Sequence, residues 1–375
     1  MSLSFLTGLR VLDLSQYIPG PYAAQMLADL GAEVVKLEPP TGDPMRRFDP
    51  PDDDGLCAAY KLINAGKRVI LLDLKTPIGQ KQALSLLARA DVLIESFRPG
   101  TLDRLGLSRD RLIELNPRLI HVALSGWGQE GPYRSRAGHD VTYMALGGGL
   151  ISSGIPETPV LICPPMADHA GAQQTVSAVL AALYGRTRTG QGAYLDVSLM
   201  ESVLSWQSVP LTLAARGQST TRGGNLLTGG AAWYRLYRTA DGRFAALAAI
   251  EDKFWQAFCV AVGHQEWIAR HKDPMPQTEL IRELDLLFSG RTLKAWQELL
   301  DPVDCCFEAL LNPEEVSNHP HIAVRKQITQ RGEGAQILVE TLLGLRVNGD
   351  CPPTRRPLIE DDAACVLADW TSAAS

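Results

Sequence analysis

The chain has 375 residues, of which 45% are hydrophobic and 21% charged, and its formal net charge is −6. This is the composition of a globular protein with one large or two medium domains, and its mild acidity argues against a nucleic-acid partner. No apolar run reaches the ~20 residues of a membrane span, and we expect no signal peptide. Seven cysteines without a CxxC pair predict no disulfide framework and no metal site, and so a cytoplasmic protein.

The first half of the chain alternates apolar strand patterns with helical patterns. Strands are predicted at 10–14, 32–38, 67–74, 91–97 and 118–126, and helices at 22–31, 77–90 and 110–116. Alternation of this kind predicts a parallel sheet with helices on both faces and ligand crevices at the carboxyl ends of its strands. A long alanine-rich helix follows at 168–190, capped near Gly190.

The pattern changes after about residue 200. We expect a large domain at 1–200, a linker rich in Gly, Ser and Thr at 201–224, a small domain at 225–325 and a C-terminal segment at 326–375 that returns to the large domain. The small domain should contain a β-hairpin at 233–250 around Ala240-Asp241-Gly242, followed by short helices.

Two features of the first half are compatible with a phosphorylated ligand. The first turn, IPGPYA, has one glycine where a dinucleotide site has three, so a structural crossover is favoured over NAD or FAD binding. Glu38 nevertheless ends the next strand, the position at which a dinucleotide-binding fold has an acidic residue. The basic residues Lys67, Arg68, Lys75 and Arg98 lie near strand ends, where they either hold a phosphate or are simply solvated.

The stretch RAGHDVTYMALGGG combines an imidazole, a carboxylate and a phenol, namely His139, Asp140 and Tyr143. A helix that starts here would place Tyr143 one turn from His139, with Asp140 capping a helix and glycines 147–149 allowing close approach of a ligand. Asp168 precedes the alanine-rich helix, where it is either an N-cap or a carboxylate in a cleft. On residue types alone, an ordinary structural role remains open for each.

Ordered motifs along nearly the whole chain resemble the family III CoA-transferases, and most closely their α-methylacyl-CoA racemase branch. They include IPGPYAAQMLADLGAEVVKLE, DVLIESFRPGTLDRLGL, LSGWGQEGPYRSRAGHDVTYMALGG and YRTADGRFAALAAIEDKFW. The resemblance implies a Rossmann-like large domain with a parallel sheet, a smaller α+β domain, and an interlocked homodimer whose active site lies between domains of different subunits. It also implies an acyl-CoA substrate, with no permanently bound cofactor and no membrane partner.

The resemblance also assigns the site residues. It implies that His139 and Asp168 are the acid/base pair of a racemase, that Glu251 supports the histidine, and that Tyr143 belongs to the same catalytic set. Contacts to coenzyme A are expected from Lys36, Asp73, Leu74, Lys75, Arg98, Gly138 and Asp140.

Removal of a proton next to a thioester needs a positioned base, and epimerisation needs an acid on the opposite face of the enolate. Histidine and aspartate side chains can exchange these two roles. The resemblance, together with this chemistry, therefore implies racemisation of a 2-methylacyl-CoA by α-proton abstraction. One alternative is a CoA-transferase in which Asp168 is the nucleophile and forms an aspartyl-CoA thioester. Another is a CoA-binding protein with degraded chemistry, suggested by Pro39 and the tail LIEDDAACV, which depart from the family pattern.

Overall fold

The computed structural model describes residues 3–218 and 221–372, and contacts within the chain divide it into two units. The first unit consists of Met1–Gly147, Cys163–Trp206 and Pro320–Ser375, and the second of Gly148–Ile162 and Gln207–His319. The C-terminal segment thus belongs to the same unit as the N-terminal half.

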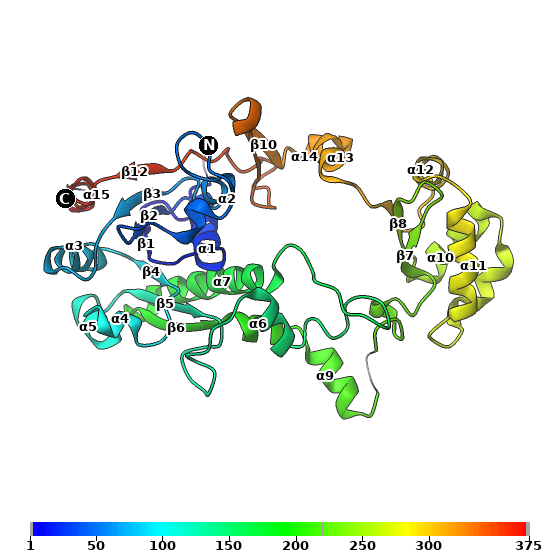
Figure 1. Ribbon diagram of the computed structural model, residues 1–375, viewed down its shortest axis with the longest axis horizontal. Coiled ribbons are helices and arrows are strands. Elements are labelled where there is room, and N and C mark those ends of the chain that lie inside the picture. Colours follow the sequence, from blue (N-terminus) through cyan, green and yellow to red (C-terminus); the bar gives the residue numbers. More distant parts are fainter. Residues whose placement is uncertain (1–2, 219–220, 373–375) are drawn as a thin grey trace. The chain divides into compact units, whose positions relative to one another are not determined.

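The first unit is built on a seven-stranded parallel sheet with the order β12-β3-β2-β1-β4-β5-β6 (Figure 1). The strands are β1 (Arg10–Asp13), β2 (Glu33–Glu38), β3 (Arg68–Leu71), β4 (Val92–Glu95), β5 (Ile120–Ser125), β6 (Ala193–Ser198) and β12 (Ile359–Asp361). Together with the antiparallel sheet of the second unit, it confirms the predicted α/β class. The chain builds the sheet outward from β1 in one direction, then returns to β4 and builds in the other, which creates a switch point between β1 and β4.

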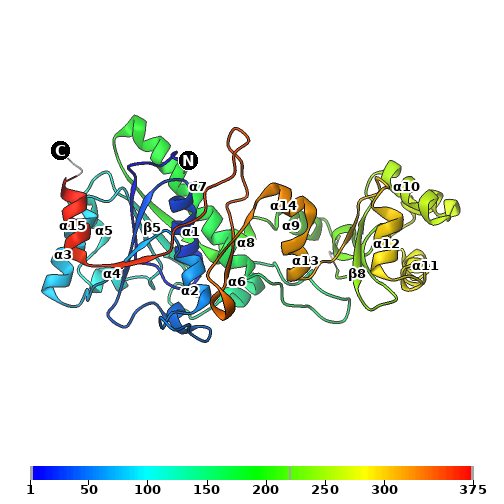
Figure 2. The same ribbon diagram turned by 90° about the horizontal axis from the view of Figure 1, so that it is seen from above.

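Helices cover both faces of this sheet. Helix α7 (Met166–Thr189) packs on α1 (Pro19–Asp29), whereas α15 (Ala363–Ser372) and α5 (Arg109–Leu115) pack on α3 (Pro77–Leu87) (Figures 1 and 2). The first unit also contains α2 (Ala58–Ile63), α4 (Thr101–Arg104), α6 (Asp140–Leu146), α8 (Leu199–Leu204), α14 (Pro320–Arg325) and the hairpin β10 (Ile328–Arg331) and β11 (Leu338–Thr341). No helix among residues 3–218 and 221–372 is long and apolar enough to cross a membrane.

Local signals set the helix ends. Helix α1 begins at Pro19 rather than at the predicted residue 22, because proline suits the first turn of a helix, where its missing N–H is not needed. The hydroxyl of Thr76 accepts a hydrogen bond from the Gly79 amide and caps α3. Gly190 ends α7 with φ of +70°, as the sequence predicts.

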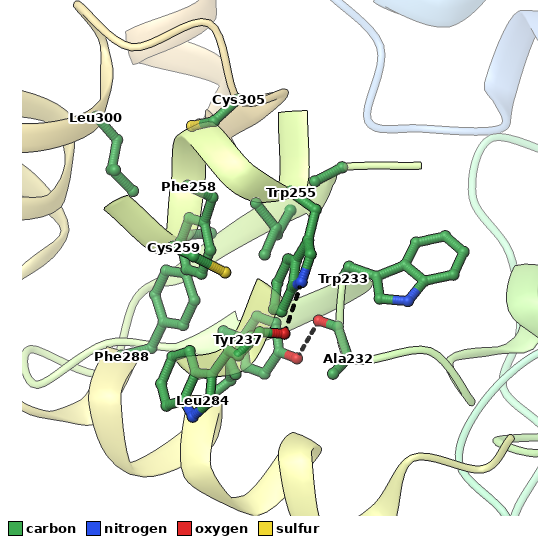
Figure 3. Packing of buried hydrophobic residues seen from close by; sticks show 14 of the residues in the cluster. Ala232, Trp233, Tyr237, Trp255, Phe258, Cys259, Leu284, Phe288, Leu300 and Cys305 are labelled. Atoms are coloured by element: carbon green, nitrogen blue, oxygen red, sulfur yellow. Dashed lines mark hydrogen bonds between the residues drawn. The ribbon is translucent and has the colours of Figure 1, made fainter. Parts of the chain in front are cut away.

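The second unit has a three-stranded antiparallel sheet of β7 (Tyr234–Arg238), β8 (Phe244–Ala248) and β9 (Phe307–Ala309). The predicted hairpin is present, with Gly242 in its turn at φ of +76°. Helices α10 (Asp252–Val262), α11 (Thr278–Ser289), α12 (Leu293–Leu300) and α13 (Pro313–Asn318) follow the hairpin or the third strand. The core of this unit is aromatic, and Tyr237 stacks on Phe288 with 4.6 Å between ring centroids while its hydroxyl donates to the Ala232 carbonyl (Figure 3).

The predicted linker at 201–224 is not entirely irregular. It includes the end of α8 and the whole of helix α9 (Ser208–Ala215). The leucines and alanines of this stretch favour helix, and Pro210 is tolerated because it lies in the first turn. The expected linker composition is concentrated after Gly217, and residues 219–220 of it lie outside the described residues.

Candidate active site

A cavity of about 230 Å³ lies in the first unit at the carboxyl ends of β1, β4, β5 and β6. The switch point between β1 and β4 is one of its borders, which is where open α/β sheets bind ligands. It is lined by Gln16, Tyr17, Pro19, Ser96, Phe97, Arg98, Pro99, Leu124, Ser125, Gly126, Trp127, Arg134, Arg136, Ala137, Gly138, His139, Tyr143, Asp168 and Leu199. The topology therefore brings together side chains from six separate parts of the sequence.

Three of the four predicted catalytic residues line this cavity. His139 is the N-cap residue of α6 and is exposed, and its backbone amide donates to the Thr142 hydroxyl at 3.1 Å. Tyr143 is buried on the same helix, one turn later. Asp168 is the third residue of α7, so it is not the N-cap of that helix; Pro165 is. His139 and Asp168, 29 positions apart in the sequence, thus share one cavity.

Asp140 caps a helix, but not the one in which it lies. It is the first residue of α6, and its Oδ1 accepts hydrogen bonds from the amides of Ala167 at 2.6 Å and Asp168 at 3.1 Å, at the amino end of α7. Pro165, the N-cap of α7, has no side-chain donor or acceptor to do this. The carboxylate of Asp140 therefore fixes the start of α7 and the backbone of Asp168.

The carboxyl group of Asp168 has an unusual acidity. Burial raises its pKa to about 7, and the negative charge of Asp140 adds to this effect. The amino end of a helix favours a carboxylate, but here that effect is outweighed. No hydrogen bond or ion pair joins the Asp168 carboxyl oxygens to any residue within the described ranges. Asp168 can therefore take up or release a proton near neutral pH.

Tyr143 fixes the loop that carries His139. Its hydroxyl donates to the Gly138 carbonyl at 2.6 Å, and its ring meets Trp127 edge-on at 4.8 Å between centroids. Burial, followed by the charge of Asp168, raises the pKa of Tyr143 to about 12, so the phenol stays protonated at neutral pH. A Cβ at Gly126 or Gly138 would come within 2.6 Å of the Tyr143 ring, so both positions need glycine for this packing.

Positive charge reaches the cavity from three arginines. Arg98 lies in the loop after β4, as predicted, and Arg134 and Arg136 come from the loop between β5 and α6. Four lining residues were not predicted from the sequence: Arg134, Arg136, Tyr17 and Trp127. Tyr17 and Trp127 each follow a strand end closely, so the strand pattern contained a signal for them.

Lys36 is not placed to contact a phosphate. It is fully buried, and its ammonium lies 2.9 Å from Asp43 Oδ2 and donates to the Ser15 carbonyl at 2.7 Å. Lys67 is buried in the same way, 2.9 Å from Asp13 Oδ2. Both lysines are held in a buried ion network, which conflicts with the expected contact of Lys36 to coenzyme A and with both alternatives for Lys67, a phosphate contact or a solvated side chain.

Of the remaining charged candidates, some are paired within the protein and one is exposed. Arg68 pairs with Asp361 at 2.7 Å. Glu38 pairs with Arg46 at 2.6 Å and accepts from the Tyr60 hydroxyl, which leaves its carboxylate unavailable to a dinucleotide. Lys75 is exposed. It stands in the loop after β3, where the Asp73 carboxylate accepts from its amide at 2.9 Å.

Leu74, in the same loop, is buried in the core, so only its backbone could meet a ligand. This loop does not line the cavity described above. Glu251 belongs to the second unit, where it is the exposed N-cap residue of α10.

Glycines 147–149 do not line the cavity, contrary to the expected close approach of a ligand there. Gly147 is the C-cap of α6, and its amide donates to the Tyr143 carbonyl at 2.9 Å. A Cβ at this position would lie 2.9 Å from the Met200 carbonyl oxygen. This glycine therefore ends α6 and lets it approach α8.

The fold and the cavity define an α/β protein with an imidazole and a carboxyl group of raised pKa in one cavity at the carboxyl edge of its parallel sheet. The family model described as CoA-transferase family III matches residues 6–352, and the chain belongs to this family. It is therefore an enzyme related to the racemases and transferases that act on CoA thioesters.

Some of the similar proteins are named as racemases and others as CoA-transferases. The chain is 36% identical to the alpha-methylacyl-CoA racemase of Homo sapiens, over 84% of this chain and 80% of the relative. It is 34% identical to the succinyl-CoA–D-citramalate CoA-transferase of Chloroflexus aurantiacus, over 86% of this chain and 82% of the relative. Its fold is similar to that of a CaiB/BaiF family protein from Brucella suis, with a TM-score of 0.83 and 29% identity over 97% of this chain and 99% of the other.

Proposed function

We propose that this enzyme racemises a 2-methylacyl-CoA by removing and returning the proton next to the thioester. The observation that carries the proposal is that His139 and Asp168 line one cavity, in which the Asp168 carboxyl group has a pKa of about 7. An imidazole and a carboxyl group of raised pKa can exchange the roles of base and acid, which is what racemisation requires in its two directions.

The steps follow from these roles. The imidazole of His139 removes the α-proton from one face of the substrate, and the electron pair left on carbon is delocalised onto the thioester oxygen as an enolate. Protonated Asp168 then delivers a proton to the other face, and the reverse direction uses the same groups with their protons exchanged. Arg98, Arg134 and Arg136 supply positive potential for the enolate and for the phosphates of coenzyme A.

The family resemblance adds two parts to this proposal. The enzyme acts as an interlocked homodimer, and Glu251 of one subunit orients the imidazole of His139. Lys75, Asp73 and the backbone of Leu74 contact coenzyme A from the loop after β3. Replacement of Glu251 by Gln then lowers the rate of proton exchange and leaves the affinity for coenzyme A unchanged.

Proton exchange in heavy water tests the proposal. The purified enzyme is incubated with a panel of acyl-CoA thioesters in deuterated buffer, and deuterium at the α-carbon is read by mass spectrometry. We expect uptake with 2-methylacyl-CoA, and a loss of about 10²-fold or more in Asp168→Asn and in His139→Gln. His169→Gln is the matched control, because His169 adjoins Asp168 in the sequence but does not line the cavity. Absence of uptake with the wild-type enzyme across the panel would refute the racemase proposal.

The second candidate is a CoA-transferase with Asp168 as nucleophile. The carboxyl oxygens of Asp168, which have no partner among residues 3–218 and 221–372, and the CoA-transferases among the relatives favour it. The carboxylate attacks the thioester carbonyl and releases the CoA thiolate; the thiolate then attacks the aspartyl carbonyl of the resulting anhydride and releases the first acid. Hydroxylamine should convert the aspartyl thioester of a transferase into a hydroxamate at Asp168, detectable by peptide mass spectrometry. A racemase is unaffected by this treatment.

The third possibility is a CoA-binding protein without chemistry. It predicts that Asp168→Ala changes neither proton exchange nor hydroxylamine sensitivity, and that coenzyme A still binds. A loss of either activity in this variant excludes it.

A further inference from the structure

Tyr17 stands against the proposed base. Its ring meets the imidazole of His139 edge-on, with 5.9 Å between ring centroids and 81° between ring planes. Both side chains line the cavity, although they are 122 positions apart in the sequence (139 minus 17). Within the part of the chain that the structure describes, Tyr17 makes the one ring contact to His139.

The backbone at Tyr17 is strained. Its φ is +62°, a left-handed conformation that a bulky L-residue rarely adopts and that glycine or asparagine adopts more easily. A residue held in such a conformation costs free energy that the surrounding structure must offset, and residues of this kind cluster at functional sites.

Three successive amides fix this conformation. The amide of Ser15 donates to Asp13 Oδ1 at 3.0 Å, and the amide of Gln16 to the Ser96 hydroxyl at 3.0 Å. The amide of Tyr17 donates to Asp43 Oδ1 at 3.4 Å. Asp13 and Asp43 are themselves buried and paired with lysines, so the loop is anchored to these buried ion pairs.

The imidazole needs such a neighbour. His139 is exposed, and an exposed side chain samples several rotamers unless a contact restricts it. Edge-to-face aromatic pairs favour one arrangement over its alternatives by a factor of up to about ten. The strained loop thus holds the Tyr17 ring against the His139 imidazole, the group proposed to remove the substrate proton.

We propose that Tyr17 is a positioning residue that holds the His139 imidazole toward the cavity through its ring, and that its hydroxyl is not required. The proposal rests on the acid/base role of His139 proposed above. It assigns a role to a residue of the first turn, which the resemblance to the family leaves without one.

Three substitutions test this role. Tyr17→Phe keeps the ring, whereas Tyr17→Asn and Tyr17→Gly remove it and accept the positive φ without strain. The two ring-free variants should fold, because relief of backbone strain offsets the lost packing. Tyr184→Ala is the control, since Tyr184 is exposed on α7 and does not line the cavity.

The kinetic readout is α-proton exchange with the acyl-CoA that the wild-type enzyme accepts. We expect Tyr17→Asn and Tyr17→Gly to lower kcat about tenfold and to change KM less than about twofold, and Tyr17→Phe and the control to retain wild-type values. Ring-free variants with kcat within twofold of wild type would overturn the proposal. A Phe variant as slow as the Gly variant would also overturn it, because the hydroxyl would then be the active part.

The structural readout does not depend on turnover. In histidine-labelled enzyme, the His139 ring signals, assigned by their loss in His139→Gln, should move in the Asn and Gly variants and stay in place in the Phe variant. Unmoved signals would refute the positioning role. If these signals move as expected but the wild-type enzyme exchanges no α-proton, the racemase proposal fails while the Tyr17–His139 contact stands.

Discussion

The carboxylate of Asp140 accepts from the backbone amide of Asp168 at 3.1 Å, so Asp140 and the cavity residue Asp168 are coupled through both a hydrogen bond and their charges. One acid fixes the other in place and also makes it harder to ionise. The first effect positions Asp168 at the start of α7, and the second contributes to a pKa near neutrality.

Asp140→Asn separates the two effects. The amide oxygen of asparagine can still accept from Ala167 and Asp168, but the like charge is gone. Because burial is the larger cause of the raised pKa, we expect the pKa of Asp168 to fall by a fraction of a pH unit. In the direction in which protonated Asp168 is the acid, activity is lost as the pH rises through its pKa, so the alkaline limb of the pH–rate profile should move to lower pH by that amount, with little change in melting temperature.

Asp140→Ala is the companion variant. It removes the charge and the cap together, so it should also lower the stability by about 1 kcal/mol. An alkaline limb that stays in place in both variants would show that the charge of Asp140 does not act on Asp168.

Asp168→Asn should stabilise the protein at alkaline pH. The pKa of Asp168 is raised from 3.8 to about 7 in the folded state, so the folded state binds the proton more tightly than the unfolded state. The stability that this group contributes is present below pH ~4, declines as the pH rises toward ~7 and is absent above that. The difference amounts to at most about 4 kcal/mol at about 1.36 kcal/mol per pH unit.

Denaturant unfolding of the wild type and Asp168→Asn measures this effect. The variant should be the more stable protein at pH 8, and the two should converge near pH 4. Equal stabilities at both pH values would show that burial does not penalise the ionised carboxyl group.

Gly126→Ala should disrupt the site. The added Cβ would lie 2.3 Å from the Tyr143 ring, so the ring or the loop must move, at a cost of about 1–3 kcal/mol. Gly185→Ala is the matched control, because this residue lies inside α7 with open space around it, and alanine there should stabilise the helix by about 0.5–1 kcal/mol. Gly126→Ala should therefore lower both the melting temperature and the rate of proton exchange. Gly185→Ala should raise the melting temperature and leave the rate of proton exchange unchanged.

Lys36→Met and Lys75→Ala separate structural from ligand-binding lysines. Loss of the buried Lys36 leaves Asp43 without its partner and should cost about 3–5 kcal/mol. Lys75 is exposed, so its loss should change the stability by less than about 0.5 kcal/mol. We expect Lys75→Ala instead to weaken binding of coenzyme A in a salt-dependent manner, measured by calorimetry. Unchanged affinity at low salt would remove Lys75 from the proposed contacts.

The family resemblance in the sequence identified the candidate acid and base, but it could not say which basic residues were available. Lys36 lies two residues before the end of an apolar strand pattern and Arg98 directly after the end of another, so both look like basic residues near a strand end. Lys36 is buried against Asp43, whereas Arg98 reaches the cavity. Whether a charge pairs internally depends on which loops converge on it, and strand periodicity does not contain that information.

The sequence by itself determined the alternation of strands and helices, the parallel sheet, the helix end at Gly190 and the hairpin around Gly242, because these depend on local patterns of apolar and turn residues. Only the tertiary structure decided that Asp140 caps α7 rather than its own helix, and that Tyr17 faces His139. Such contacts join segments far apart in the chain, and their geometry is fixed by the order of strands in the sheet, which brings the loops after β1, β4 and β5 to a single edge.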